Sequence, residues 1–295
     1  MEQIKQSLML CWGIGGKQIV IIMSNSKQWS SATPGYILFL VDQSDSMNEF
    51  YPEKGNKANF VAMVINRTIN ELININMNGD KVKDRVFISI IGYGNPDVKE
   101  IRSDYLSKYA ESPLRIESGK QKQSDGNGGL MEIDVQNPIW LEPVAEKLTP
   151  MGSALEFARN LISSWMQQKA DNPAPVIINV SDGLPCPEEE EKKSVTMAKE
   201  IMALSCNDGN SIIFNAHIGE GSAKCVCSES ESELPDEQAR FLFSISSRIP
   251  ESYKAAAQKT ELDIKANSKG FVSDADPETF IKFINFGSSG GSDKR

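Results

Sequence analysis

Short apolar runs and longer apolar stripes alternate along the chain. Residues 37–41 are five consecutive apolar positions, which is typical of a strand buried on both faces of a parallel sheet. From 57 to 73 the apolar residues recur every three or four positions, as on the inner face of a helix. A second apolar run follows at 86–91. This order predicts an α/β fold with a doubly wound, mostly parallel sheet and helices on both faces.

The alternation continues toward the carboxyl end. Helical patterns are predicted at 152–168 and 188–204, and buried strands at 176–180 and 211–218. The last quarter of the chain predicts four shorter elements, which are helices at 239–246 and 253–259, an edge strand at 270–272 and a terminal helix at 277–286. The acidic run at 188–191 is interpreted as the solvated start of a helix, where negative charge favours the helix dipole.

The stretch from 96 to 148 is the least regular part of the chain. It predicts a strand near 98–101, a helical turn near Leu106 and a short strand at 133–135. Its glycines and polar residues lie between these elements. We interpret the stretch as an elaborated connection that carries a β-hairpin.

The length of 295 residues suits one large α/β domain. We expect that domain to cover 34–286, with an N-terminal extension outside the fold at 1–33 and a flexible tail at 287–295. The apolar runs within the first 22 residues are too short to span a bilayer, and no cleavage-site pattern follows them. These features predict a cytoplasmic protein without a membrane anchor.

The net charge limits the classes of partner, and the cysteine content indicates the redox state of the compartment. The formal net charge of −9 argues against nucleic acid and anionic membranes as partners. The five cysteines are an odd number and show no framework spacing, so we expect reduced thiols. Cys225 and Cys227 form half of a metal or redox pattern, but no second cysteine pair accompanies them.

Polar side chains follow the first apolar strand at alternate positions. Asp42, Ser44 and Ser46 are spaced so that one tight loop directs three oxygen atoms at a single point. Carboxylate and hydroxyl oxygens are hard ligands, which suit Mg²⁺, Mn²⁺ or Ca²⁺ rather than Zn²⁺. The loop is therefore a candidate site for a hard divalent cation.

Two later positions complete the candidate site. Thr149 lies just before the helical pattern at 152–168, and Asp182 follows the predicted strand at 176–180. Ligands of open α/β sheets bind beyond the carboxyl ends of the strands, so these loops are expected to meet Asp42 there. Taken singly, serine, threonine and aspartate are also common cap and turn residues. Their joint order favours a metal site.

The three motifs resemble the metal-ion-dependent adhesion site of von Willebrand factor A (vWA) domains, and the resemblance covers 34–286. It implies that Ser44, Ser46 and Thr149 bind Mg²⁺ directly, while Asp42 and Asp182 act through water or hydrogen bonds. It also implies that the last coordination position takes an Asp or Glu carboxylate from a protein partner. Asp45 stands where the family often has glycine, which bears on the choice of ion.

A narrower resemblance rests on Trp140, on Thr149 with the Pro and Met after it, and on a Ser-Asp-Gly-x-Pro loop at 181–185. These features are similar to bacterial stand-alone intracellular vWA proteins of the tellurium-resistance-associated type. That type implies a stress or defence signalling complex in which the partner is a kinase, a phosphatase or an AAA+ ATPase.

Enzymatic alternatives have less support in the sequence. A haloacid-dehalogenase-type phosphotransferase needs a second Asp where Ser44 stands, and a serine hydrolase needs a G-x-S-x-G motif, which the sequence lacks. His217 is the only histidine and is interpreted as a core or rim residue. A Mg²⁺-dependent phosphohydrolase stays open because a hydrated ion can activate water. A structural subunit with an empty site is the third alternative.

Overall fold

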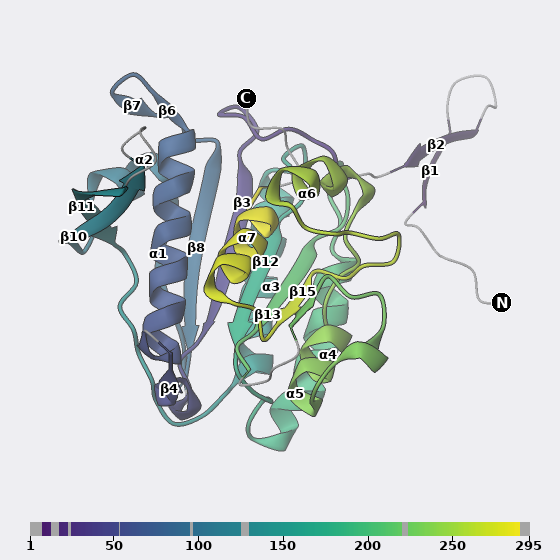
Figure 1. The fold of residues 1–295 in the computed structure, drawn as a ribbon. Helices are drawn as coiled ribbons and strands as arrows, with labels where there is room; N and C mark the ends of the chain where they lie inside the picture. The colour runs from purple at the N-terminus through teal and green to yellow at the C-terminus, as the bar shows by residue number, and fades with distance from the viewer. Residues whose placement is uncertain are drawn as a thin grey trace.

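The computed structural model describes residues 8–12, 18–22, 25–52, 54–94, 97–124, 130–219 and 224–289. A seven-stranded sheet with the order β14-β15-β13-β12-β3-β8-β9 forms the centre of the molecule (Figure 1). Its strands are β3 (Gly35–Asp42), β8 (Val86–Tyr93), β9 (Val98–Tyr105), β12 (Val176–Ser181), β13 (Ile212–His217), β14 (Cys225–Val226) and β15 (Phe271–Ser273).

The five inner strands are parallel to one another, and β14 and β9 pair antiparallel at the two edges. The predicted doubly wound, mostly parallel sheet is therefore confirmed. The antiparallel edge strand β9 is longer than the strand expected near 98–101, and α2 (Leu106–Glu111) follows it as the helical turn expected there.

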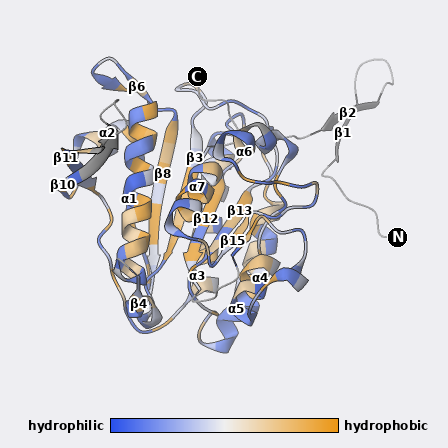
Figure 2. Ribbon diagram, in the orientation of Figure 1, coloured by the Kyte–Doolittle hydropathy of each residue, from blue (hydrophilic) through white to orange (hydrophobic). Residues whose placement is uncertain are grey.

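Helices cover both faces of the sheet. One face carries α1 (Lys57–Ile75), α6 (Lys254–Thr260) and α7 (Pro277–Gly287), and the other carries α3 (Met151–Gln168), α4 (Glu188–Ala203) and α5 (Glu237–Ser244). Side chains of β3 alternate between the two layers, so that Phe39 packs with the α1 layer and Leu40 with the α3 layer. Figure 2 shows the resulting hydrophobic sheet between helices whose outer faces are hydrophilic.

The β-hairpin expected within 96–148 is much longer than the strand predicted at 133–135. Strands β10 (Arg115–Ser124) and β11 (Leu130–Ile139) pair antiparallel over ten residues each. The cross-strand partners include a charged pair, Lys120 and Asp134. Such exposed polar strands carry no apolar run, so the sequence pattern marked only the short segment with two β-branched residues.

The expectation of an edge strand at 270–272 is wrong. Strand β15 lies between β13 and β14, and every one of its residues is buried. The true edge is β14, whose Cys225 and Val226 pair antiparallel with Ser273 and Val272. A two-residue strand is too short to leave a periodic signal in the sequence.

The chain packs against the domain ahead of the expected boundary at residue 34. Trp29 is 8% exposed within the core, and the backbone of Ser26 and Lys27 donates hydrogen bonds to the Asp208 carboxylate. Earlier in the expected extension, β1 (Leu8–Trp12) and β2 (Gln18–Ile22) form an antiparallel pair. At the other end Ser288 is buried, and the rest of the expected tail beyond 289 lies outside the described residues.

The remaining elements are short. Two-residue strands pair as β4 (Phe50–Tyr51) with β5 (Gly55–Asn56) and as β6 (Met77–Asn78) with β7 (Lys81–Val82). The 3₁₀ turns are η1 (Asp45–Asn48), η2 (Glu231–Glu233) and η3 (Glu251–Tyr253). In the described part of the chain, each helix is too short or too polar to cross a membrane.

Candidate metal centre

The carboxyl ends of β3 and β12 lie side by side where the winding of the sheet reverses. The two strands pair in parallel with Val41 opposite Val180, so the residues that follow them emerge at the same edge. The chain leaves β3 for α1 on one face and leaves β12 for α4 on the other. Ligands of doubly wound sheets bind at such a reversal of the winding.

Asp42 ends β3 and its carboxylate is buried, with 1% of the residue exposed. The Ser44 N–H donates to Oδ1 at 2.8 Å, and the Ser181 hydroxyl donates to Oδ2 at 2.5 Å. Burial, followed by the neighbouring charge of Asp182, raises the pKa of Asp42 to about 7, although hydrogen bonds from Ser181 and Ser44 oppose the shift. Among the described residues, no cation contacts this carboxylate.

A continuous path of hydrogen bonds joins Asp42 to Asp182. The hydroxyl oxygens of Ser44 and Ser46 are 3.1 Å apart, and the Ser46 hydroxyl donates to Asp182 Oδ1 at 2.8 Å. Ser44 is 2% exposed and precedes η1, which turns Ser46 back toward the β12 loop. Four of the five residues predicted from sequence are therefore linked directly.

The backbone of Thr149 is bound to the loop that follows β12. It lies in the loop before α3, is 7% exposed, and forms an isolated antiparallel bridge with Cys186 in the loop after β12. The Cys186 N–H donates to the Thr149 carbonyl oxygen at 3.0 Å. The loop that carries Thr149 is thus fixed to the loop that carries Asp182.

The start of α3 is also held by α4. The Glu190 carboxylate accepts hydrogen bonds from the Ser153 N–H at 2.7 Å and from the Ser153 hydroxyl at 2.8 Å. A Cβ added at Gly152 would lie 2.7 Å from the Glu190 carbonyl oxygen, so the two helices approach closely there. Glu190 is therefore not part of a fully solvated helix start, which corrects the interpretation of 188–191, whereas the other three glutamates are exposed.

Lys57 is a site residue that sequence reasoning missed. It begins α1, and its ammonium group donates to Asp182 Oδ2 at 2.9 Å and to Glu49 Oε2 at 2.5 Å. Burial lowers the pKa of Lys57, but hydrogen bonds to Glu49 and Asp182 outweigh this effect and raise it. No signal in the sequence distinguished this lysine from an ordinary solvated one.

Buried polar side chains of β8, β12 and β13 form a row of hydrogen bonds beneath the loops of the site. The Tyr93 hydroxyl donates to Asn179 Oδ1 at 2.8 Å, and the Asn179 amide donates to Asn215 Oδ1 at 2.9 Å. All three residues are fully buried. Because unsatisfied buried polar groups are costly, this row of satisfied groups fixes the register of β8, β12 and β13 beneath the loops.

His217, Cys225 and Cys227 are not grouped with the five candidate metal residues. His217 is 2% exposed, its Nδ1 lies 2.8 Å from the Ser273 hydroxyl, and burial lowers its pKa. Burial raises the pKa of Cys225, and raises that of Cys227 to about 12. In the part of the chain that the structure describes, no three His, Cys, Asp or Glu side chains are grouped to hold a metal ion.

The donors at the carboxyl edge fit a hard divalent cation. Asp42 and Asp182 offer carboxylate oxygens, and Ser44 and Ser46 offer hydroxyl oxygens. Across the residues that the structure describes, no cation contacts the buried Asp42 carboxylate. Mg²⁺, Mn²⁺ or Ca²⁺ suits this donor set.

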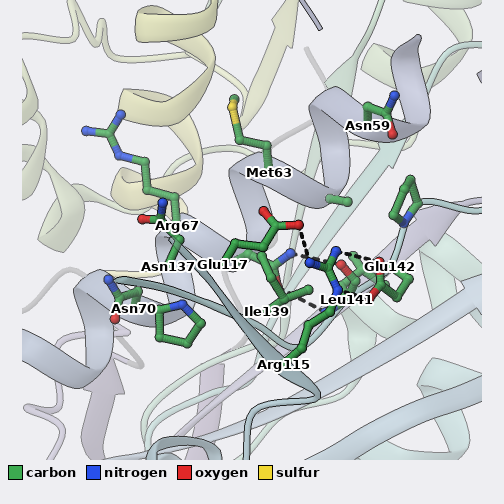
Figure 3. A pocket seen from close by; sticks show the side chains of 14 residues that line it. Asn59, Met63, Arg67, Asn70, Arg115, Glu117, Asn137, Ile139, Leu141 and Glu142 are labelled. Carbon is green, nitrogen blue, oxygen red and sulfur yellow. Dashed lines mark hydrogen bonds and ion pairs between the residues drawn. The ribbon is translucent and has the colours of Figure 1, made fainter. Parts of the chain in front are cut away.

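A separate cavity of about 350 Å³ lies between α1 and the β10–β11 hairpin (Figure 3). Arg115 points across it and pairs with Glu117 and, at 2.7 Å, with Glu142. Arg115, Glu117 and Glu142 thus pair with one another. None of the five predicted metal residues lines the cavity. Beside it, Asn66 on α1 binds the chain that leaves the hairpin, as its amide donates to the Leu141 carbonyl oxygen at 2.8 Å.

The sheet order and register form the Rossmann-like α/β arrangement expected for a vWA domain. The fold is vWA-like. No protein-family model matches the chain, and no curated protein sequence matches it.

Solved structures with some likeness include the ArnB paralog VWA2 from Sulfolobus acidocaldarius, which is 17% identical with a TM-score of 0.34. The match covers 64% of this chain and 36% of VWA2. The vWF domain of the pilus tip protein Mfa5 from Porphyromonas gingivalis matches at 17% identity, with 52% and 39% coverage and a TM-score of 0.30. The PilB minor pilin from Streptococcus sanguinis matches at 11%, with 87% and 61% coverage and a TM-score of 0.44.

The chain therefore covers less than two thirds of each of these proteins. Likenesses of this degree concern the general fold, and do not extend to the site or its chemistry.

Proposed function

We propose that this protein is a metal-dependent protein–protein interaction module. Asp42, Ser44, Ser46, Thr149 and Asp182 would hold one Mg²⁺ ion, and the ion would capture an Asp or Glu carboxylate of a partner. The observation that supports the proposal is the hydrogen-bonded path from Asp42 through both serines to Asp182 at the reversal of the sheet. Mn²⁺ or Ca²⁺ would suit the same oxygen donors.

The ligand set of the site accounts for the choice of partner. Two carboxylates and three hydroxyl groups would leave the ion a free position for a ligand from a partner. A hard ion attracts a carboxylate in preference to a neutral group. The ion would supply the attraction, and the buried loops would supply its position.

The proposal is tested with Mn²⁺, a paramagnetic ion. Water that binds to the ion and exchanges with bulk water increases the proton relaxation rate of the solution. We expect wild-type protein to bind Mn²⁺ and enhance proton relaxation, and we expect N-acetylglutamate to reduce the enhancement by displacing water. The Ser44→Ala/Ser46→Ala variant should lose Mn²⁺ binding, whereas Ser164→Ala on the exposed side of α3 should retain it. Equal binding by wild type and the double variant would contradict the proposal.

We also propose that the protein is not an enzyme. The alternative, a Mg²⁺-dependent phosphohydrolase, requires turnover of a phosphoester such as p-nitrophenyl phosphate that Asp42→Asn abolishes. Such turnover would establish the alternative in place of the binding function. A structural subunit with an empty site would show neither turnover nor metal binding.

The setting that we propose follows the resemblance of the motifs to bacterial intracellular vWA proteins. The protein would act in a cytoplasmic stress or defence complex, with a kinase, a phosphatase or an AAA+ ATPase as its partner. Partner capture from a bacterial lysate, with Mg²⁺ or with chelator, compares wild type with Ser44→Ala/Ser46→Ala. A partner retained equally in all conditions would not be the one that the metal site recruits.

A further inference from the structure

Lys57 places a buried cation at the proposed metal site. Its side chain is 5% exposed, and its ammonium group bridges the carboxylates of Asp182 and Glu49. We infer that Lys57 is a tethered cation that competes with the metal for Asp182, and that Glu49 moderates this competition. The inference rests on the proposed function, because it describes how the same site sets its affinity for the ion.

Both oxygens of Asp182 have donors inside the protein. Oδ1 accepts the Ser46 hydroxyl at 2.8 Å, and Oδ2 accepts the Lys57 ammonium at 2.9 Å. A divalent ion that uses Asp182, directly or through water, must share this carboxylate with Lys57. The ammonium group holds Asp182 in place before an ion arrives, and it also repels that ion.

The position of Lys57 in the chain keeps its charge at the site. It is the first residue of α1, and the preceding Asn56 caps the helix by accepting a hydrogen bond from the Asn59 N–H. The Lys57 N–H donates to the Glu49 carbonyl oxygen at 3.1 Å. Backbone and side chain are therefore both bound to Glu49, which favours the inward position of the ammonium group.

Glu49 has the opposite effect on an incoming ion. Its side chain is 54% exposed, and its carboxylate accepts the second contact of the Lys57 ammonium. The Glu49 carboxylate offsets part of the positive charge of Lys57, and the ammonium group divides its contacts between Glu49 and Asp182. Removing the Lys57 charge should therefore strengthen metal binding, and removing the Glu49 charge should weaken it.

The test is isothermal titration of Mg²⁺ and of Mn²⁺ into the full chain. We expect Lys57→Met to bind each ion at least tenfold more tightly than wild type, and Glu49→Gln to bind at least threefold more weakly. Lys57→Arg, which keeps the charge, should stay within threefold of wild type. Lys54→Met, three residues before Lys57 and ahead of α1, is the matched control for loss of a positive charge, and its affinity should be unchanged, since Lys54 makes no ion pair among the described residues.

The opposite signs expected for Lys57→Met and Glu49→Gln separate the inference from a general loss of structure. Circular dichroism identifies variants that do not fold, and Lys57→Gln replaces Lys57→Met if the methionine is not accepted. Binding by wild type together with equal or weaker binding by the folded Lys57 variant would overturn the inference alone. Absence of binding by wild type and all variants would overturn the proposed function itself, and the inference with it.

Discussion

Burial of the Asp42 carboxylate is the residue-scale feature from which the chemistry of the site follows. The side chain lies at the end of a strand buried on both faces, and it accepts hydrogen bonds from the Ser44 N–H and the Ser181 hydroxyl. A buried carboxylate without a cationic contact is costly in its charged form. A proton relieves this cost, and in the proposed function a metal ion would do the same.

The pH dependence of stability tests this cost in the absence of metal. The pKa of Asp42 rises from 3.8 to about 7 on folding, so the unfolded chain releases its proton first as pH increases. This residue therefore lowers stability between about pH 4 and pH 7, by a few kcal/mol at most, and the cost is fully present above pH 7.

We expect Asp42→Asn to raise the urea midpoint relative to wild type at pH 8 in chelator, and to leave it nearly unchanged at pH 4. Asp45→Asn, at an exposed position in the same loop, is the matched control and should behave like wild type at both pH values. A midpoint for Asp42→Asn below that of wild type at pH 8 would show that the charged form is stabilised instead.

Residue patterns predicted part of this centre and missed the rest. Asp42, Ser44, Ser46 and Asp182 were recognisable because the motif spacing and the adjoining apolar strands coincide. Lys57 was not, because a lysine that begins an amphipathic helix is normally solvated. Its inward direction depends on Glu49 and Asp182, which only the folded chain brings together.

At the scale of elements, the contact between α3 and α4 positions the loop that carries Thr149. Glu190 on α4 accepts two hydrogen bonds from Ser153 in the first turn of α3, where a negative charge also favours the helix dipole. We expect Glu190→Gln to lower the free energy of unfolding by about 1–2 kcal/mol, because it removes charge-assisted hydrogen bonds. Urea denaturation measures this change.

Glu189→Gln is the control for Glu190→Gln, since Glu189 is exposed in the same turn of α4. We expect its effect to stay within about 0.5 kcal/mol. Equal effects of the two substitutions would show that general charge in the helix start, rather than the contact with Ser153, supports α3.

The attachment of the β10–β11 hairpin to α1 rests on Asn66. Its Oδ1 accepts the N–H groups of Trp140 and Leu141, and its amide donates to the Leu141 carbonyl oxygen. We expect Asn66→Ala to lower the free energy of unfolding by about 2–4 kcal/mol, because it leaves buried backbone groups without partners. Asn70→Ala, one helical turn later, should change it by less than about 0.5 kcal/mol.

Differential scanning calorimetry or urea titration distinguishes the two asparagines. A small effect of Asn66→Ala would mean that water satisfies the released backbone groups and that the hairpin does not depend on this contact. The hairpin itself was predicted only in part, since β10 is largely polar and apolar residues alternate over only a short part of β11. In contrast, α1 and β12 were predicted closely because their apolar patterns are strong.

At the scale of the whole molecule, the sequence predicted the parallel centre of the sheet and not its edges. Buried parallel strands such as β3 and β13 are continuous apolar runs, which makes them recognisable singly. The antiparallel edge strands are either polar, as in β9, or only two residues long, as in β14. The meeting of Asp42 and Asp182 was expected from the general rule for open α/β sheets, whereas the strand order that places β12 beside β3 is known from the structure.

The most direct test of a metal-binding centre is a thermal-shift titration with Mg²⁺ on wild type and on Ser44→Ala/Ser46→Ala. An ion that binds only the folded state adds about 2.7 kcal/mol of stability at one hundred times its Kd. For a chain of this size we expect a rise in Tm of roughly 5 °C in wild type, and no rise in the double variant. An equal rise in both proteins, or no rise in wild type at millimolar Mg²⁺, would contradict the account.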